Sequence, residues 1–196
     1  MRNATFILLA LLALPLFGQE QPVNQEAASA TVAESSVKTW FDPAMKLTWR
    51  YEVLDDNSAK IVGVGEFKEK FEKLTVPSVI DGHPVTTLGF AAFKGAHNSM
   101  DYSKNSALDA RLIVCIPTSV TTIEEGTFHN TDSRPSNVLT SRTLVELAPG
   151  NEHFTLEGRF FLISKEGVLL HVYLPFNCLF VEIPDGVVRI GAHVLE

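Results

Sequence analysis

Two pairs of adjacent carboxylates, Asp55-Asp56 and Glu124-Glu125, come nearest to a catalytic arrangement in this sequence. Two carboxyl groups placed across a substrate can act as general acid and general base. Asp55-Asp56 begins a run of turn-forming residues that ends at Ser58, and such runs connect strands. Glu124-Glu125 lies between two apolar positions of a recurring pattern. We therefore expect both pairs to be solvated structural residues.

The six histidines are possible metal ligands or general bases, but they are dispersed along the chain. Zinc sites use ligands in short paired spacings, which these histidines lack. The sequence also has no Gly-rich phosphate loop, no Gly-x-Ser-x-Gly nucleophile elbow and no calcium-binding loop. A Ser/His/Asp site could be assembled from scattered residues, but no motif supports one. The sequence therefore predicts no catalytic residue, no cofactor and no metal, and a protein that is not an enzyme.

The two cysteines, Cys115 and Cys178, would be free to pair in an oxidising compartment. Cys115 stands between the apolar residues Val114 and Ile116, so strand alternation points its side chain to the opposite face. Cys178 falls in a non-adjacent turn of the recurring pattern, whereas a disulfide needs Cα atoms within about 7 Å. We expect no bridge between them.

A five-point apolar pattern recurs along the chain, and the fold that it produces must position the carboxylates, histidines and cysteines described above. The clearest copy contains Ile116-Pro117, Val120, Ile123 and Phe128. The third and fourth points are three residues apart in every copy, and the fourth and fifth are five apart. Recurrence at this period indicates a stack of repeats that bury their apolar faces against one another. The other copies are Val76-Pro77, Val85, Leu88, Phe93 and Ile183-Pro184, Val187, Ile190, Leu195.

A short strand precedes each turn of the pattern, with apolar residues two apart. The predicted strands align Leu74/Val76, Val114/Ile116, Leu147/Pro149 and Val181/Ile183. Residues of the opposite alternation, with Ala148 among them, form an outward face. The candidate ligand-binding residues on it are Lys73, Thr75, Ile113, Cys115, Glu146, Phe180 and Glu182. Among them Phe180 and Ile113 could anchor a partner, because exposed apolar side chains often do. Neighbouring loops could instead cover them.

The beginning of the chain has the features of a secretory signal peptide at residues 1–18. Arg2 precedes the apolar run Phe6 to Phe17, which is shorter than the roughly twenty residues of a membrane helix. A retained membrane anchor is the alternative. Residues 19–39 are rich in Gln, Glu, Ala and Ser without an aromatic residue, which predicts a flexible linker.

Residues 40–196 are predicted to form one domain. Alternating apolar residues from Leu47 to Val53, a turn at 55–58 and a second strand from Ala59 predict a hairpin over about 45–65. This hairpin would cap the first repeat, and the repeats would occupy about 70–196. The pattern reaches Leu195 without a following cap, so we expect either a fragment or an end that meets another molecule.

The charge of the chain limits its partners. The formal net charge is −7, and it becomes one unit more negative without residues 1–18, which contain Arg2 and no acidic residue. Clustered Lys and Arg are needed for phosphate backbones and for anionic membranes. None is seen, so we expect no nucleic-acid partner and no membrane insertion after cleavage of the signal peptide. The sequence does not specify an oligomeric state.

These motifs resemble the BspA-type leucine-rich repeats of bacterial secreted and surface proteins. That family's pattern is an apolar strand ending in Ile-Pro, then Val-Thr-x-Ile-Gly, then Ala-Phe. The resemblance covers about residues 45–196, including the segment from Val76-Pro77 to Ala92-Phe93 and the hairpin-like unit Gly158 to Pro175. Thr127 and Val194 depart from the Ala of the pattern. The resemblance implies an open leucine-rich repeat solenoid, with parallel strands on one face and turns or short helical pieces on the other.

For some relatives the resemblance implies adhesion, or contact with a host or matrix. We therefore expect a non-catalytic exported module that binds a protein or a surface glycan through its strand face. Loops 94–111 and 129–142 would adjust its specificity. The alternatives are a repeat part of a larger secreted enzyme such as a hydrolase, and a structural spacer of a surface protein.

Overall fold

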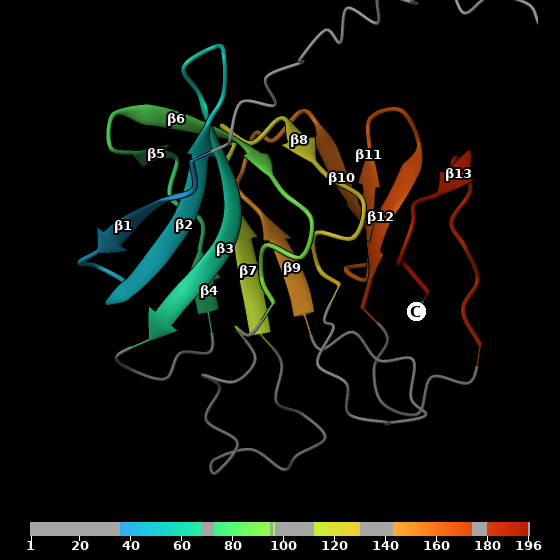
Figure 1. Ribbon diagram of the computed structural model, residues 1–196. Coiled ribbons are helices and arrows are strands. Elements are labelled where there is room, and N and C mark those ends of the chain that lie inside the picture. Colours follow the sequence, from blue (N-terminus) through green and yellow to red (C-terminus); the bar gives the residue numbers. More distant parts are fainter. Residues whose placement is uncertain are drawn as a thin grey trace, which may run out of the picture. The chain divides into compact units, whose positions relative to one another are not determined.

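The computed structural model describes residues 36–67, 73–94, 96, 112–129, 143–173 and 180–195. The predicted signal peptide, most of the predicted linker, Cys178 and most of the loops 94–111 and 129–142 lie outside them. The described part of the chain is built from strands and turns, without an α-helix (Figure 1). The strands are β1 (Lys38–Asp42), β2 (Leu47–Val53), β3 (Ala59–Phe67), β4 (Lys73–Thr75), β5 (Val79–Ile80), β6 (His83–Leu88), β7 (Leu112–Ile116), β8 (Thr122–Ile123), β9 (Thr143–Leu147), β10 (Phe154–Glu157), β11 (Phe161–Ser164), β12 (Val168–Val172) and β13 (Arg189–Ile190).

The N-terminal hairpin forms where the alternation of apolar residues predicts it. β2 pairs antiparallel with β3, with Tyr51 opposite Ile61, and the turn between them places Asn57 at a positive φ of 64°. Trp49 and Tyr51 are buried on the inner face. β1 adds a third antiparallel strand that begins at Lys38, inside the stretch predicted as linker.

Two parallel ladders follow the hairpin. In one, β4, β7 and β9 lie side by side, with Leu74 opposite Val114 and Val114 opposite Val145. In the other, β6 pairs with β3 on one side and with β8 on the other, and Leu88 stands opposite Ile123. The chain therefore alternates between the ladders, from β4 to β6 and then from β7 to β8. Two successive turns of the chain place equivalent residues next to each other, as the repeat pattern predicts.

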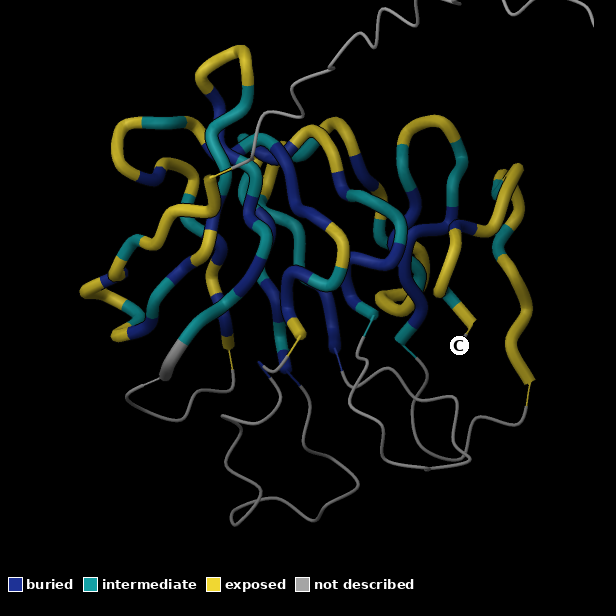
Figure 2. Tube along the Cα trace, in the orientation of Figure 1, coloured by how far each residue is buried: buried dark blue, intermediate teal, exposed yellow. Residues whose placement is uncertain are grey.

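The first two copies of the apolar pattern fill one core. Their equivalent positions are all buried: Val85, Leu88 and Phe93 in the first copy, and Val120, Ile123 and Phe128 in the second. The rings of Phe93 and Phe128 stack with centroids 5.4 Å apart, and the centroid of the His171 ring lies 4.5 Å from that of Phe128. Figure 2 shows the buried strand segments in the interior of the ladders and the mostly exposed chain from 180 onward.

The apolar residues of the third copy do not continue this core. Ile190 and Leu195 are 39% and 48% exposed, where their counterparts in the second copy are buried. β13, which contains Ile190, pairs in parallel with β12 and not with β8. The prediction that all three copies share one buried core is therefore wrong for the third, because the β10–β12 unit lies between β8 and β13 in the chain and provides β13 with its partner strand. The turn of the third copy still contacts that of the second, where the Ala192 N–H donates to Glu125.

Two details of the predicted strand register also differ. Val145 and Leu147 stand opposite Val114 and Ile116, so the third strand is two residues earlier than the alignment of Leu147 with Val114 predicts. A shift of two residues keeps each side chain on its predicted face. Val181 to Ile183 form no strand, so the predicted fourth strand is absent from this position.

The C-terminal sheet repeats the arrangement of the N-terminal one. In both, the second strand of a hairpin pairs with a parallel strand. The glycine that follows the parallel strand donates its backbone N–H to a carbonyl of the hairpin, Gly89 to Ile61 at 2.8 Å and Gly191 to Leu169 at 2.9 Å. A Cβ at either glycine would lie about 3 Å or less from the accepting carbonyl oxygen (3.0 and 2.9 Å). The close approach of the two backbones therefore requires glycine at both sites.

The segments that carry the pattern back into the core are turns, where the resemblance implies turns or short helical pieces. Ala91, Gly126 and His193 occupy the same position of the three copies, three residues after Leu88, Ile123 and Ile190. All three have positive φ, at 51°, 76° and 61°. A shared left-handed residue shows that the third copy keeps the local conformation of the pattern although its apolar residues are exposed.

Candidate functional site

The predicted binding residues of the first three strands lie together on the β4–β7–β9 ladder. Its register places Thr75, Cys115 and Glu146 in one row across the strands, and Lys73 and Ile113 in the next row. Lys73 and Thr75 are exposed and the others are half-buried. The backbone hydrogen bonds of a sheet hold adjacent strands about 4.8 Å apart, so these five side chains form a fixed surface. We call it the strand face.

An ion pair crosses the middle strand of this face. The Lys73 ammonium on β4 donates to Glu146 Oε2 on β9 over 2.8 Å. This hydrogen bond lowers the pKa of the Glu146 carboxyl and raises the pKa of the Lys73 ammonium, so both groups are charged near neutral pH. Both side chains are about half exposed, and such pairs add little stability. Their contribution is therefore a fixed pattern of charge on the surface.

Cys115 lies beneath this ion pair and carries a free thiol. Its Sγ donates to Glu146 Oε2 at 3.5 Å. Burial, and then this hydrogen bond to a carboxylate, raise the pKa of the Cys115 thiol. Only the thiolate is a good nucleophile, so this geometry favours a packed, unreactive cysteine.

Phe180 and Glu182 do not belong to the strand face. Both lie in a segment without strand structure, and Phe180 is 89% exposed. The prediction that they line the same ladder is wrong, because the chain leaves the ladder after β9 and residues 180–183 precede β13 in a different sheet. Sequence alternation alone does not reveal this departure, since Phe180 to Ile183 alternate as a strand would.

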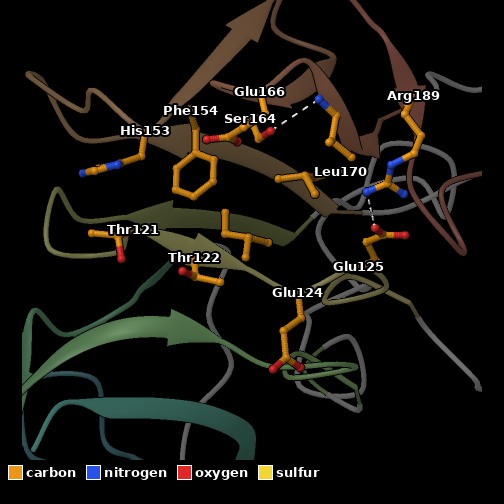
Figure 3. Close-up of a pocket in the computed structure, with 12 residues that line it drawn as sticks. Thr121, Thr122, Glu124, Glu125, His153, Phe154, Ser164, Glu166, Leu170 and Arg189 are labelled. Carbon is orange, nitrogen blue, oxygen red and sulfur yellow. Dashed lines mark hydrogen bonds and ion pairs between the residues drawn. The ribbon is translucent and has the colours of Figure 1, made fainter. Parts of the chain in front are cut away.

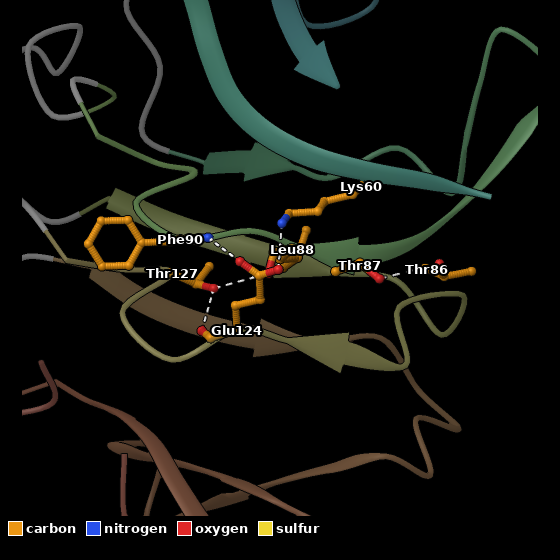
Figure 4. Close-up of polar contacts among 7 residues, drawn as sticks. All are labelled: Lys60, Thr86, Thr87, Leu88, Phe90, Glu124 and Thr127. Carbon is orange, nitrogen blue, oxygen red and sulfur yellow. Dashed lines mark hydrogen bonds and ion pairs between the residues drawn. The ribbon is translucent and has the colours of Figure 1, made fainter. Parts of the chain in front are cut away.

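Glu124 and Glu125, the acidic pair that the sequence suggests for catalysis, connect neighbouring turns of the chain. Glu124 Oε1 lies 2.5 Å from the Lys60 ammonium, and Oε2 accepts the backbone N–H of Phe90 at 2.8 Å (Figure 4). Glu125 reaches the other way, accepting from Arg189 at 2.5 Å and from the backbone N–H of Ala192 at 2.6 Å. Both carboxylates are therefore partly exposed residues held in structural contacts, as the sequence predicts.

Thr127, which replaces alanine in the family pattern, has a structural role that the sequence does not suggest. Its side chain is fully buried, and its hydroxyl lies within hydrogen-bond distance of two backbone carbonyl oxygens, 2.6 Å from Glu124 and 3.2 Å from Leu88 (Figure 4). A buried hydroxyl needs such partners. The threonine joins the turns of the first two copies.

A cavity of about 380 Å³ lies between β8 and the C-terminal sheet (Figure 3). Its apolar lining comes from Ile123, Phe154, Val168 and Leu170. The polar residues around it come from both sides: Thr121, Thr122, Glu124, Glu125, His153, Ser164, Glu166 and Arg189. The sequence does not indicate this site, because one of its walls is a sheet that the repeat pattern does not contain.

Most of the charged side chains of the two sites are held in ion pairs. In the cavity, Glu124 and Glu125 are already engaged, and Arg189 is paired with Glu125. Within the described ranges, no group of three or more His, Cys, Asp or Glu residues could hold a metal ion, and no helix is long and apolar enough to cross a membrane.

Comparison with known proteins gives limited similarity. No protein-family model matches the sequence, and no curated protein matches it either. The crystal structure of the pneumococcal vaccine antigen PcpA aligns with 82% of this chain and 62% of that one, at 11% identity and a TM-score of 0.35. A leucine-rich repeat protein from Eubacterium ventriosum aligns with 82% and 57%, at 15% identity and a TM-score of 0.30. This chain therefore matches less than two thirds of either structure.

Proposed function

We propose that this chain is a non-catalytic binding module that recognises a protein or a surface glycan through the strand face. The observation that carries this proposal is the common register of Thr75, Cys115 and Glu146 on three parallel strands, beside Lys73 and Ile113. The backbone ladder fixes all five before any ligand arrives. Recognition by a preformed surface avoids most of the cost of ordering side chains on binding.

The chemistry of the strand face suits recognition by many weak contacts. It combines one half-buried apolar side chain, Ile113, with an ion pair and the hydroxyl of Thr75. An apolar anchor with polar groups at its edge is the usual composition of a protein interface. The Lys73–Glu146 pair would contribute orientation more than affinity, because exposed charges mainly steer association.

We further propose that the two buried copies belong to a leucine-rich repeat solenoid of the BspA type, in a protein that is exported and presented at the cell surface. The stacking of Phe93 on Phe128 and the parallel pairing of β6 with β8 support the repeat architecture. The apolar run between Phe6 and Phe17 supports export. Adhesion is the activity that such a location would serve.

The experiment is a binding panel of defined extracellular-matrix proteins and surface glycans, immobilised and probed with the purified chain. We expect wild type to bind at least one ligand, and Ile113→Asp to weaken that binding at least tenfold. Thr155→Asp, at an exposed position of β10, is the matched control and should bind as wild type does. The Lys73→Glu/Glu146→Lys double exchange keeps the ion pair while moving its charges, so it tests charge placement without losing the contact.

Two results would contradict the proposal. If Ile113→Asp bound every ligand as tightly as wild type, recognition would lie elsewhere on the molecule. If wild type bound no member of the panel, the spacer interpretation would be favoured instead. Circular dichroism of each variant must match wild type before its binding is compared.

A further inference from the structure

The outer edge of β13 carries a backbone donor and acceptor at Ile190. β13 is the last strand of the C-terminal sheet, and within the described ranges it pairs only with β12 (Figure 1). The residues on either side of Ile190 both bond to β12. The N–H of Arg189 lies 3.4 Å from the Gly167 carbonyl oxygen, and that of Gly191 lies 2.9 Å from the carbonyl oxygen opposite Ile190. Successive residues of a parallel strand direct their backbone groups to opposite sides, so those of Ile190 point away from β12.

The equivalent residue of the first copy shows what such an edge binds. Leu88 occupies the place of Ile190 in the pattern. Gly89 donates to β3 in the same way that Gly191 donates to β12. The Leu88 carbonyl accepts the N–H of Glu124 at 2.9 Å, so β8 pairs with this edge. The backbone of Ile190 therefore has the orientation that pairs with a further strand in the first copy.

The third copy also exposes the apolar side chains that the pattern buries in the other two. Val188 is 76% exposed, and Ile190 and Leu195 are 39% and 48% exposed. Val187 and Val194 pack against the smaller apolar cluster of the C-terminal sheet and remain partly exposed themselves. Exposed apolar residues gathered in one segment mark an interaction surface.

We propose that the outer edge of β13 pairs with the same edge of a second copy of this chain, so that two C-terminal sheets join across a twofold axis. β13 has two residues, and only Ile190 directs its backbone outward. In an antiparallel pair, two residues directly opposite each other exchange both of their hydrogen bonds. Ile190 therefore matches Ile190 of the second copy, which is the self-complementary contact that a twofold interface requires.

The charges at this edge are compatible with such a pair. An antiparallel register centred on Ile190 sets Arg189 of one copy opposite Gly191 of the other, so like charges do not oppose each other. The Arg189 guanidinium is also neutralised by Glu125 of its own chain. Two hydrogen bonds orient the copies, and burial of apolar side chains such as Val188 supplies most of the affinity. Association depends on concentration, so Ile190 is exposed in dilute solution and covered in concentrated solution.

The test is analytical ultracentrifugation of the purified chain over a concentration series. We expect wild type to form a dimer at micromolar concentrations. Val188→Asp should raise the dissociation constant at least tenfold, because it removes an apolar contact and places two like charges near the twofold axis. Val79→Asp, at a 51% exposed apolar position on β5, is the matched control and should associate as wild type does.

Two further measurements locate the contact at β13. In a Cys115→Ser/Cys178→Ser background, Ile190→Cys should form a covalent dimer on mild oxidation, because directly opposite residues lie within the roughly 7 Å that a disulfide spans. Val79→Cys should stay monomeric on a non-reducing gel. On dimerisation, hydrogen exchange of the Ile190 amide should slow at least tenfold, whereas that of Gly191, which already bonds to β12, should change little.

The proposal is overturned if wild type stays monomeric throughout the series, which would leave this edge to a partner other than the chain itself. It is also overturned if a dimer forms while exchange of the Ile190 amide is unchanged, or if Val79→Cys cross-links as readily as Ile190→Cys. Association would then use another surface. Ile113→Asp, on the strand face, should dimerise as wild type does, so the dimer and the proposed binding function succeed or fail separately.

Discussion

At the scale of single residues, Glu124 and Glu125 show how a pair with catalytic potential is used for structure. Adjacent residues of a strand end point in opposite directions, so the two carboxylates reach Lys60 on one side and Arg189 on the other. Each also accepts a backbone N–H from a neighbouring copy of the pattern, Phe90 or Ala192. The two glutamates link the three copies at their turns. Two adjacent acidic residues in a sequence do not reveal such contacts.

The Glu125 carboxylate should make stability depend on pH. Hydrogen bonds from Arg189 and Ala192 lower its pKa from 4.5 to about 2. A carboxyl whose pKa is lowered by folding stabilises the native state above its unfolded pKa, and this stabilisation disappears as the pH falls through the folded pKa. We therefore expect Glu125→Gln to lower the urea midpoint at pH 7, and the difference from wild type to shrink between pH 4.5 and pH 2.

The control for this experiment is Glu152→Gln, at an exposed position, which should change the urea midpoint little at either pH. A Glu125→Gln deficit that stayed constant from pH 7 to pH 2 would show that its hydrogen bonds are not specific to the charged carboxylate.

At the scale of elements, the same unit occurs twice: a hairpin followed by a parallel strand that ends in glycine. β3 and β6 form the first unit, and β12 and β13 form the second, with Gly89 and Gly191 in equivalent contacts. The two units differ in whether another strand covers the parallel one. β6 is covered by β8, whereas β13 is an outer strand within the described residues. Equivalent apolar positions are thus buried in one unit and exposed in the other.

This difference predicts unequal costs for the same substitution at equivalent positions. Ile123, 6% exposed, and Ile190, 39% exposed, are the fourth point of their copies. We expect Ile123→Ala to cost about 2–5 kcal/mol in the free energy of unfolding, as for a buried isoleucine. Ile190→Ala should cost less than about 1.5 kcal/mol, since much of that side chain already contacts solvent. Urea denaturation of both variants measures the difference, and equal costs would mean that the third copy is buried.

At the scale of the whole described domain, one apolar core connects the N-terminal hairpin with the C-terminal sheet. The main cluster runs from Leu47 and Trp49 on β2 to Leu162 and Leu170 on β11 and β12. A smaller cluster of Ile163, Leu169 and Val172 lies on the other face of the C-terminal sheet. Because the main cluster includes both ends of the stack, we expect residues 40–173 to unfold together.

Phe128→Ala tests this cooperativity. Phe128 is buried and its ring contacts those of Phe93 and His171, so its loss should cost about 3–5 kcal/mol. The urea transition followed by tryptophan fluorescence, which includes buried Trp49, should shift as much as the transition followed by far-UV circular dichroism. Phe180→Ala, at an 89% exposed position, should shift neither. A change in circular dichroism without a change in tryptophan emission would show that the hairpin and the repeats unfold separately.

Local pattern in the sequence predicts the elements whose burial depends on their immediate neighbours. The alternation from Leu47 to Val53 predicts β2, and the spacing of Val120, Ile123 and Phe128 predicts the buried turn of the second copy. The outward side of β4, β7 and β9 follows from the same alternation. The alternation predicts the register of β9 two residues away from the true one, because Val145 and Leu147 are equally apolar and either could stand opposite Val114.

The amino-acid sequence by itself determines the periodicity of this protein, because a buried side chain must recur wherever the chain makes the same turn. It does not determine which strand each copy pairs with. Pairing depends on which other strands are available, and among the described residues the β10–β12 unit pairs with β13 while β8 pairs with β6 alone. Only the tertiary structure therefore decides that Phe180 lies off the ladder, that Glu124 and Glu125 join three copies, and that a cavity opens beside Thr122.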